Sequence, residues 1–102
     1  MALTIKLKKP VEGLQEITLR DIETGDYVRL GPVMTPIVDD QGRKRLFEDT
    51  KVLKGYLTRI SGLTEKQISE MAFKDFLAAR AFVINQLAFG EDSGEETETP
   101  SS

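Results

Sequence analysis

The chain has 102 residues, with 14 basic and 17 acidic side chains and a net charge of −3. It contains no histidine and no cysteine, so the usual zinc and copper ligands, the commonest general base and the usual nucleophile pairs are missing. Carboxylate chemistry or a magnesium site stays possible in principle. We expect a protein that is not an enzyme, with no catalytic residue, no metal and no cofactor.

Membrane and export signals are also missing from the sequence. No uninterrupted apolar run approaches the roughly 20 residues that a membrane-spanning helix needs. Residues 1–10 carry lysines but lack the apolar segment of a signal peptide. We therefore expect no membrane partner and no cleaved leader.

The first 20 residues predict an antiparallel β-hairpin. Apolar and polar residues alternate over residues 3–8, and the alternation resumes over residues 14–20 after a turn at Pro10 and Gly13. A two-stranded hairpin is marginal by itself, so its apolar face needs a cover. The only sizeable candidates are the helices expected downstream.

Residues 21–45 carry weaker signals. A turn at residues 24–26 precedes a short helical or extended piece that ends near Leu30. Residues 31–45 contain two prolines and the run Asp-Asp-Gln-Gly at 39–42, and they predict a mobile loop that could hold a short strand pair around that turn. The two aspartates lack the ligand spacing of an EF-hand, so we expect an ordinary turn and not a metal site.

From about Phe47 the apolar spacing becomes helical and predicts a first long helix that ends near Gly62. Gly55 lies inside this helix, where glycine costs roughly 1 kcal/mol relative to alanine. The cost indicates that Gly55 permits a close approach by a neighbouring segment.

The clearest local signal is a tight corner between two helices. Gly62 suits the left-handed conformation that ends a helix, with Leu63 packing back on the last turn. Thr64 and Gln67 have the spacing of a capping box, and Leu63 and Ile68 have that of a hydrophobic staple. These five residues predict a structural corner but indicate no activity.

Two further helices are expected, over residues 65–71 and approximately 74–89, and the sequence leaves open whether they join. The last one carries too much apolar surface for one core stripe. The side expected to face the core has Phe73, Phe76, Leu77, Val83, Ile84 and Leu87. A neighbouring side has Ala78, Ala81, Phe82 and Phe89. We expect Ala78, Phe82 and Phe89 to bind a partner; alternatively, the two phenylalanines pack under residues 31–45.

Together these elements predict an α+β fold, in which a small N-terminal antiparallel β-hairpin packs against about three C-terminal α-helices. Residues 1–89 would form a single domain. Residues 90–102 contain five acids and no base, and are expected to form a disordered acidic tail. A core with few aromatic residues often gains stability from a partner, so self-association is also possible.

Two short basic runs remain, at residues 6–9 and 43–45. Proteins that bind nucleic acid generally have a larger basic excess and aromatic residues for stacking. We therefore expect Lys6, Lys8, Lys9 and Arg43–Arg45 to be solvated, and nucleic acid is not an expected partner.

The order of these motifs resembles a known family, the small tail assembly chaperones of contractile-tailed bacteriophages, which include E-type and Mu-like proteins. The resemblance covers roughly residues 3–88. It rests on a Leu-x-Ile-x-Leu strand, Pro10, Ile17–Arg20, Gly25–Asp26, Leu57–Thr64, Ile68, Met71 and Asp75. Residues 31–45 and the acidic tail have no counterpart in it.

This resemblance implies a non-enzymatic role in the host bacterial cytoplasm. Proteins of this family bind the long helical tape-measure protein, keep it soluble before the tail tube forms around it, and are absent from the mature virion; the tube protein is a further possible partner. Some also exist in a longer, frameshifted form. Two alternatives stay open. One is a structural tail or baseplate component that is retained in the virion, and the other is a small regulatory protein that binds nucleic acid.

Overall fold

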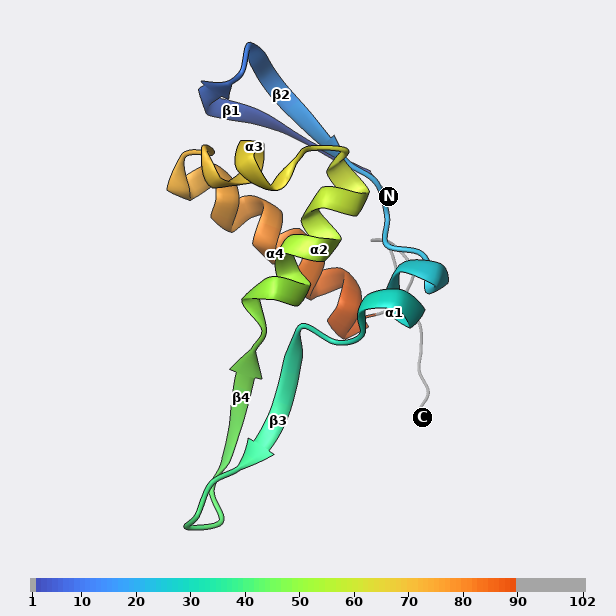
Figure 1. Ribbon diagram of the computed structural model, residues 1–102, viewed down its shortest axis with the longest axis vertical. Coiled ribbons are helices and arrows are strands. Elements are labelled where there is room, and N and C mark those ends of the chain that lie inside the picture. The colour runs from blue at the N-terminus through green and yellow to red at the C-terminus, as the bar shows by residue number, and fades with distance from the viewer. Residues whose placement is uncertain (1, 90–102) are drawn as a thin grey trace.

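The computed structural model describes residues 2–89, which form an α+β fold of two β-hairpins and four helices (Figure 1). The elements in chain order are β1 (Leu3–Val11), β2 (Leu14–Leu19), α1 (Thr24–Leu30), β3 (Met34–Val38), β4 (Lys44–Glu48), α2 (Thr50–Ser61), α3 (Glu65–Ser69) and α4 (Phe73–Phe89). The helices occupy the middle, with one hairpin at each end of the long axis. The predicted fold class is confirmed. The acidic tail expected over residues 90–102 lies outside the described residues.

The β1–β2 hairpin forms as predicted. Its antiparallel register places Ile5 opposite Ile17 and Leu3 opposite Leu19. Ile5, Ile17 and Leu19 are buried, because α4 covers β1 and α2 packs against β2. The register shifts between Lys6 and Val11, so the middle of β1 is not paired regularly with β2.

The expected loop at residues 31–45 is instead largely a second β-hairpin. β3 and β4 pair antiparallel around a turn at residues 39–43, so the strand pair that the sequence left open is present. The Asp39 carboxylate accepts hydrogen bonds from the backbone amides of Gln41 and Arg43, both at 2.9 Å. The first long helix consequently begins at Thr50, after an N-cap at Asp49, and Phe47 belongs to β4.

The core is built around α2. Leu53, Tyr56, Leu57 and Ile60 recur at helical spacing and are all buried. A Cβ atom added at Gly55 would lie 2.9 Å from Cδ2 of Leu30 at the end of α1. The glycine therefore allows α1 to approach α2 closely, as its position in the sequence suggested.

The corner between α2 and α3 has the geometry that the sequence indicates. Gly62 has φ +78°, in the left-handed region. The Gln67 amide donates to Oγ1 of Thr64 at 3.1 Å, and Oε1 of Gln67 accepts from the Thr64 amide at 2.9 Å. Leu63 and Ile68 are both buried. The second and third predicted helices are separate, because α3 ends at Ser69 and α4 begins at Phe73.

None of the helices in residues 2–89 has the length and apolar character needed to cross a membrane.

Candidate protein-binding surface

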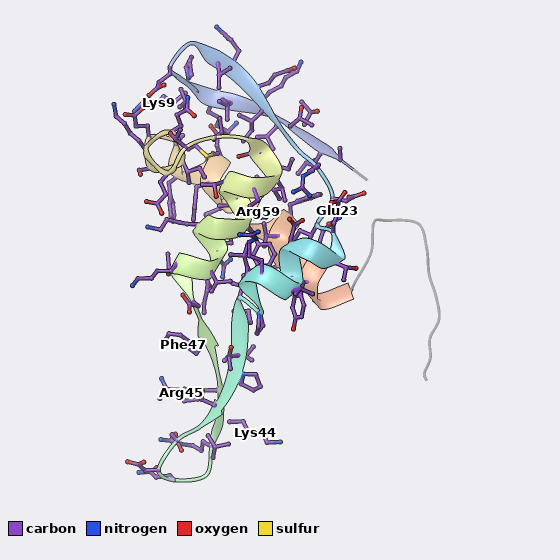
Figure 2. The ribbon with its side chains drawn as sticks, turned by 45° about the vertical axis from the view of Figure 1, so that its right-hand side comes forward. Lys9, Glu23, Lys44, Arg45, Phe47 and Arg59 are labelled. Carbon is purple, nitrogen blue, oxygen red and sulfur yellow. The ribbon has the colours of Figure 1, made fainter. Side chains whose placement is uncertain are left out.

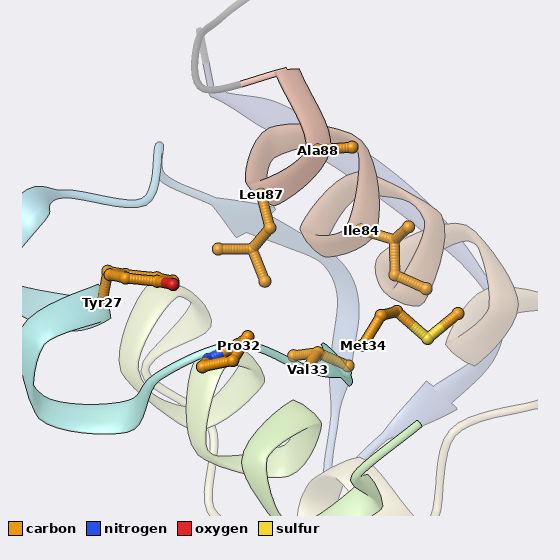
Figure 3. Close-up of a pocket in the computed structure, with 7 residues that line it drawn as sticks. All are labelled: Tyr27, Pro32, Val33, Met34, Ile84, Leu87 and Ala88. Carbon is orange, nitrogen blue, oxygen red and sulfur yellow. The ribbon is translucent and has the colours of Figure 1, made fainter. Parts of the chain in front are cut away.

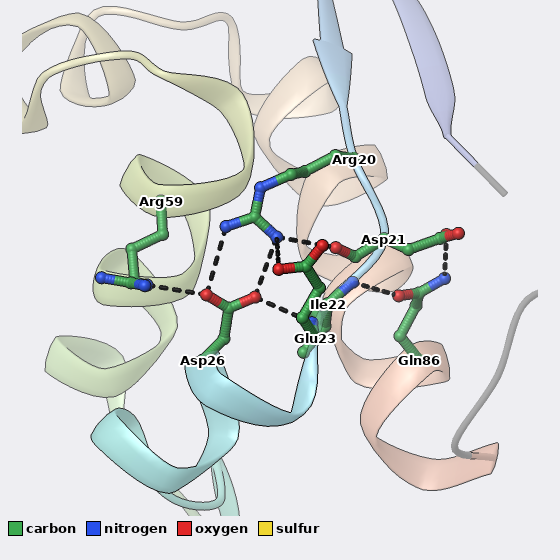
Figure 4. A network of polar contacts seen from close by, with 7 residues as sticks. All are labelled: Arg20, Asp21, Ile22, Glu23, Asp26, Arg59 and Gln86. Carbon is green, nitrogen blue, oxygen red and sulfur yellow. Dashed lines mark hydrogen bonds and ion pairs between the residues drawn. The ribbon is translucent and has the colours of Figure 1, made fainter.

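Two buried polar side chains fix the orientation of α4. Near its start, Asp75 accepts a 2.8 Å hydrogen bond from the backbone amide of Lys8 in β1. Near its end, Oε1 of Gln86 accepts from the Ile22 amide at 2.7 Å, and Nε2 of Gln86 donates to Asp21 at 2.8 Å (Figure 4). α4 is thus fastened to the N-terminal segment at both ends, which determines which of its faces points outward.

The buried stripe of α4 has polar residues at both ends. Asp75, Ala79, Val83 and Gln86 follow helical spacing, and all four are buried. Apolar residues occur on every side of this helix, so their periodicity does not identify the inward face. The sequence interpretation missed the stripe because an aspartate and a glutamine are not ordinary core residues.

The outward face of α4 differs from the expected one. Phe73 is 71 % exposed and Leu77 is 39 % exposed, although both were expected to line the core. Ala78 is exposed, as expected for the partner face. Phe82, also expected there, is instead half-buried and packs against the core. The side chain of Phe89 lies outside the described part of the structure.

An apolar hollow adjoins Phe73. It has a volume of about 320 Å³ and lies among α2, α3 and the first turns of α4. Its lining residues are Thr50, Lys54, Ile68, Ser69, Met71, Phe73 and Phe76. A hollow beside an exposed aromatic ring on a rigid helix is a feature of protein-binding surfaces.

A second hollow, of about 170 Å³, lies towards the other end of α4 (Figure 3). Ile84, Leu87 and Ala88 of α4 line it, facing Tyr27 of α1 and residues 32–34. Between the two hollows along α4, Arg80 forms a two-point ion pair with Glu48, at 2.6 Å and 3.0 Å. Hydrogen bonding by Arg80 holds the pKa of Glu48 below its usual value.

The charged network around Asp26 serves the fold (Figure 4). The carboxylate of Asp26, which is 1 % exposed, accepts from Arg20 Nη1 at 2.9 Å and from Arg59 Nε at 2.8 Å. It also accepts from the Glu23 amide at 2.8 Å. These hydrogen bonds, with Arg20 contributing most, hold the pKa of Asp26 far below its usual range. The carboxylate joins the end of β2 to α1 and α2, and it has no proton to exchange near neutral pH.

The two basic runs do not form one surface. Lys6, Lys8 and Lys9 belong to β1, whereas Arg43–Arg45 lie at the far end of the other hairpin (Figure 2). Among residues 2–89 there is also no group of three or more carboxylates that could hold a metal ion. The structure therefore brings together neither a continuous basic patch nor a cluster of metal ligands in the part that it describes.

Comparison of this chain with protein-family models, with curated proteins and with solved structures found no match. The resemblance to tail assembly chaperones rests on the sequence motifs quoted for it. Several of those residues have structural roles: Gly62 and Thr64 form the helical corner, Asp26 joins β2 to the helices, and Asp75 fastens α4.

Proposed function

We propose that this protein is a tail assembly chaperone that covers an apolar helical segment of the tape-measure protein with the outward face of α4. The observation that carries the proposal is the exposure of Phe73 and Leu77 on one face of a helix, beside an apolar hollow. An amphipathic partner helix lays its apolar side chains on such a surface. The family resemblance suggests the partner class, and the exposure of Phe73 and Leu77 supports the choice of this face.

The chemistry of the described residues favours binding over catalysis. Asp26 and Glu48 are ionised carboxylates held by arginines in ion pairs. Neither carboxylate lines either of the two hollows described above. The two hollows beside α4 have mostly apolar linings, and apolar surface supports association by the hydrophobic effect.

The proposed mechanism relies on many weak contacts. One exposed aromatic ring and its neighbours bury little area, so a single copy binds weakly and tube subunits can displace it. Many copies along one helical rod compensate through multivalency. The five acids of residues 90–102 would then give the covered rod a repelling charge that keeps it soluble.

The test is co-expression of the tagged chain with the tape-measure protein of the same phage. The wild type should raise the soluble fraction of the tape measure and retain it during purification. Phe73→Glu should abolish retention, because it places a charge in the apolar contact. Val28→Glu is the matched control, since Val28 is 78 % exposed on α1, which adjoins the end of α4 opposite Phe73. No retention by the wild type, or equal loss in both variants, would refute the proposal.

A chaperone of this kind is displaced during assembly and is absent from the mature virion. We therefore expect mass spectrometry of purified virions to detect tube and tape-measure proteins but not this chain. Its presence at stoichiometric levels would instead identify it as a structural tail component.

A further inference from the structure

The β3–β4 hairpin has two unequal edges. Two hydrogen bonds, one at each end of the hairpin, show which residue pairs are hydrogen-bonded to each other. The Asp39 amide donates to the Arg43 carbonyl at 2.9 Å, and the Asp49 amide donates to the Val33 carbonyl at 2.8 Å. Such pairs alternate with pairs whose backbone groups point away from the partner strand. The outward-pointing pairs are therefore Met34 with Glu48, Pro36 with Leu46, and Val38 with Lys44.

Because of this alternation, the outer edge of β4 has a complete set of backbone donors and acceptors, whereas that of β3 does not. On β3 the central outward position is Pro36, which has no amide hydrogen, so a further strand cannot pair regularly there. On β4 the outward positions Lys44, Leu46 and Glu48 each offer both an N–H and a C=O. Within the described residues the hairpin is a two-stranded sheet, and no other strand pairs with β4. An exposed edge of this kind is a template for another strand.

We propose that the strand that pairs with this edge is β4 of a second copy of this chain, antiparallel about a two-fold axis at Leu46. In that register Lys44 of each copy lies opposite Glu48 of the other, and the two Leu46 residues meet at the axis. On the opposite face, Arg45 lies opposite Phe47 of the other copy. A parallel arrangement in register would place the lysines opposite each other and the glutamates likewise, which is unfavourable.

The charge pattern of β4 therefore favours antiparallel pairing with β4 of a second copy over parallel pairing. Opposite charges directly across a strand pair are favourable, and a two-fold arrangement uses each pair twice. The Glu48 carboxylate is already oriented by Arg80, so it meets the lysine of the second copy in a fixed position. Lys44, Leu46 and Glu48 are all outward-pointing, so every backbone hydrogen bond of the new pairing is available.

The exposure of the hairpin supports the same conclusion. It projects from the helical body (Figure 1). Leu46 is 68 % exposed and Val38 is 65 % exposed on one face, while Ile37 and Phe47 are exposed on the other. Two-stranded hairpins are marginal in water, and three or more strands with an apolar face are needed for independent stability. Edge pairing would join the two hairpins into one four-stranded sheet with apolar side chains on both faces.

A single cysteine provides the first test, because the chain has none of its own. At the axis, hydrogen-bonded residues lie about 5.5 Å apart at Cα, within the range of a disulfide. Full-length Leu46→Cys should form a covalent dimer on mild oxidation. Val38→Cys is the matched control, being similarly exposed on the β3 edge, and should stay monomeric on a denaturing gel. Equal cross-linking of both, or of Val38→Cys alone, would overturn the inference.

Proline substitutions test the backbone pairing. Leu46→Pro and Val38→Pro each remove an outward amide, so neither loses a hydrogen bond between β3 and β4. In sedimentation experiments across a concentration series, Leu46→Pro should weaken dimerisation at least tenfold while Val38→Pro leaves it unchanged. Circular dichroism should show unchanged helix content in both. A wild type that stays monomeric at all concentrations would contradict the proposal, as would equal effects of the two prolines.

A charge reversal tests the register. Lys44→Glu places like charges opposite each other at both ends of the pairing and should dissociate the dimer. Lys9→Glu makes the same change in net charge at the opposite end of the molecule and should leave the dimer intact. Equal dissociation by both would indicate a general charge effect and refute the register. The inference does not use the α4 face, so Phe73→Glu should leave the dimer unaffected whatever its effect on the tape-measure protein.

Discussion

The backbone amide of Lys8 donates a 2.8 Å hydrogen bond to the carboxylate of Asp75, which lies 67 positions later in the chain. The bond occurs where the register of β1 shifts relative to β2, so a side chain of α4 takes the place of a strand partner. Asp75 is buried by this contact. A polar residue in the first turns of α4 therefore sets how the helix lies on the hairpin.

We predict that Asp75→Ala lowers the free energy of unfolding by about 1–3 kcal/mol, because it removes the carboxylate that accepts from a partly buried backbone amide. Asp75→Asn should recover part of the loss, since its carbonyl oxygen can accept from Lys8. Urea denaturation followed by circular dichroism measures both variants. Unfolding midpoints equal to that of the wild type would mean that water replaces the carboxylate.

The second prediction concerns Asp26 and pH. Its pKa is lowered on folding, mainly by its hydrogen bonds to Arg20, so at acidic pH the unfolded chain binds more protons than the folded one. Its contribution is complete above the unfolded pKa of about 4, and it is lost as the pH falls below that value towards the folded pKa. Stability should therefore fall on acidification below about pH 5.

Asp26→Asn removes this dependence. It should lower the free energy of unfolding by about 2 kcal/mol at pH 7, less than for a fully buried pair, because Arg20 and Arg59 remain partly exposed to water. It should also flatten the decline between pH 5 and pH 3, which thermal denaturation at several pH values can follow. Asp40→Asn, at an exposed turn position, is the control. An unchanged acid slope in Asp26→Asn would show that other carboxylates dominate.

The parts of the fold that were predictable are those encoded by neighbouring residues. The corner from Gly62 to Ile68 depends on a left-handed glycine and a capping box, which involve residues a few positions apart. The β1–β2 hairpin follows from alternation of apolar and polar residues over one continuous stretch. Local rules of this kind need no knowledge of the tertiary packing.

The parts that were not predictable depend on distant residues. The outward face of α4 is determined by Asp75 bonding to β1 and by Gln86 bonding to Ile22, and no spacing in α4 shows either contact. The β3–β4 hairpin contains Pro36, which argues against a strand unless the register points its nitrogen outward. The register became known only from the structure, which explains why a loop was expected.

The third prediction concerns the close approach of α1 and α2 at Gly55. Alanine there adds a Cβ atom 2.9 Å from Cδ2 of Leu30, while it favours the helix by about 1 kcal/mol. The two effects should nearly cancel in Gly55→Ala, since the end of a leucine side chain can move. In a Leu30→Ala background the contact is gone, and the same change should stabilise by about 1 kcal/mol. A double-mutant cycle measures the difference, and strict additivity would show that the contact costs nothing.

The last prediction concerns how the β3–β4 hairpin is attached to the body. Arg80 of α4 holds Glu48 at the base of β4 through two hydrogen bonds, and both side chains are partly exposed. A pair of this kind contributes little to global stability, about 1 kcal/mol or less.

Arg80→Met keeps most of the apolar stem and removes the guanidinium, so the midpoint of urea unfolding should change little. Exchange of the amides that bond between β3 and β4, at residues 35, 37, 45 and 47, should nevertheless become faster, because local opening no longer breaks the ion pair. Lys51→Met, at an exposed position in the first turn of α2, should leave that exchange unchanged. If Arg80→Met instead lowers the protection of α2 and β1 and spares the hairpin, then Arg80 supports the core and does not hold the hairpin in place.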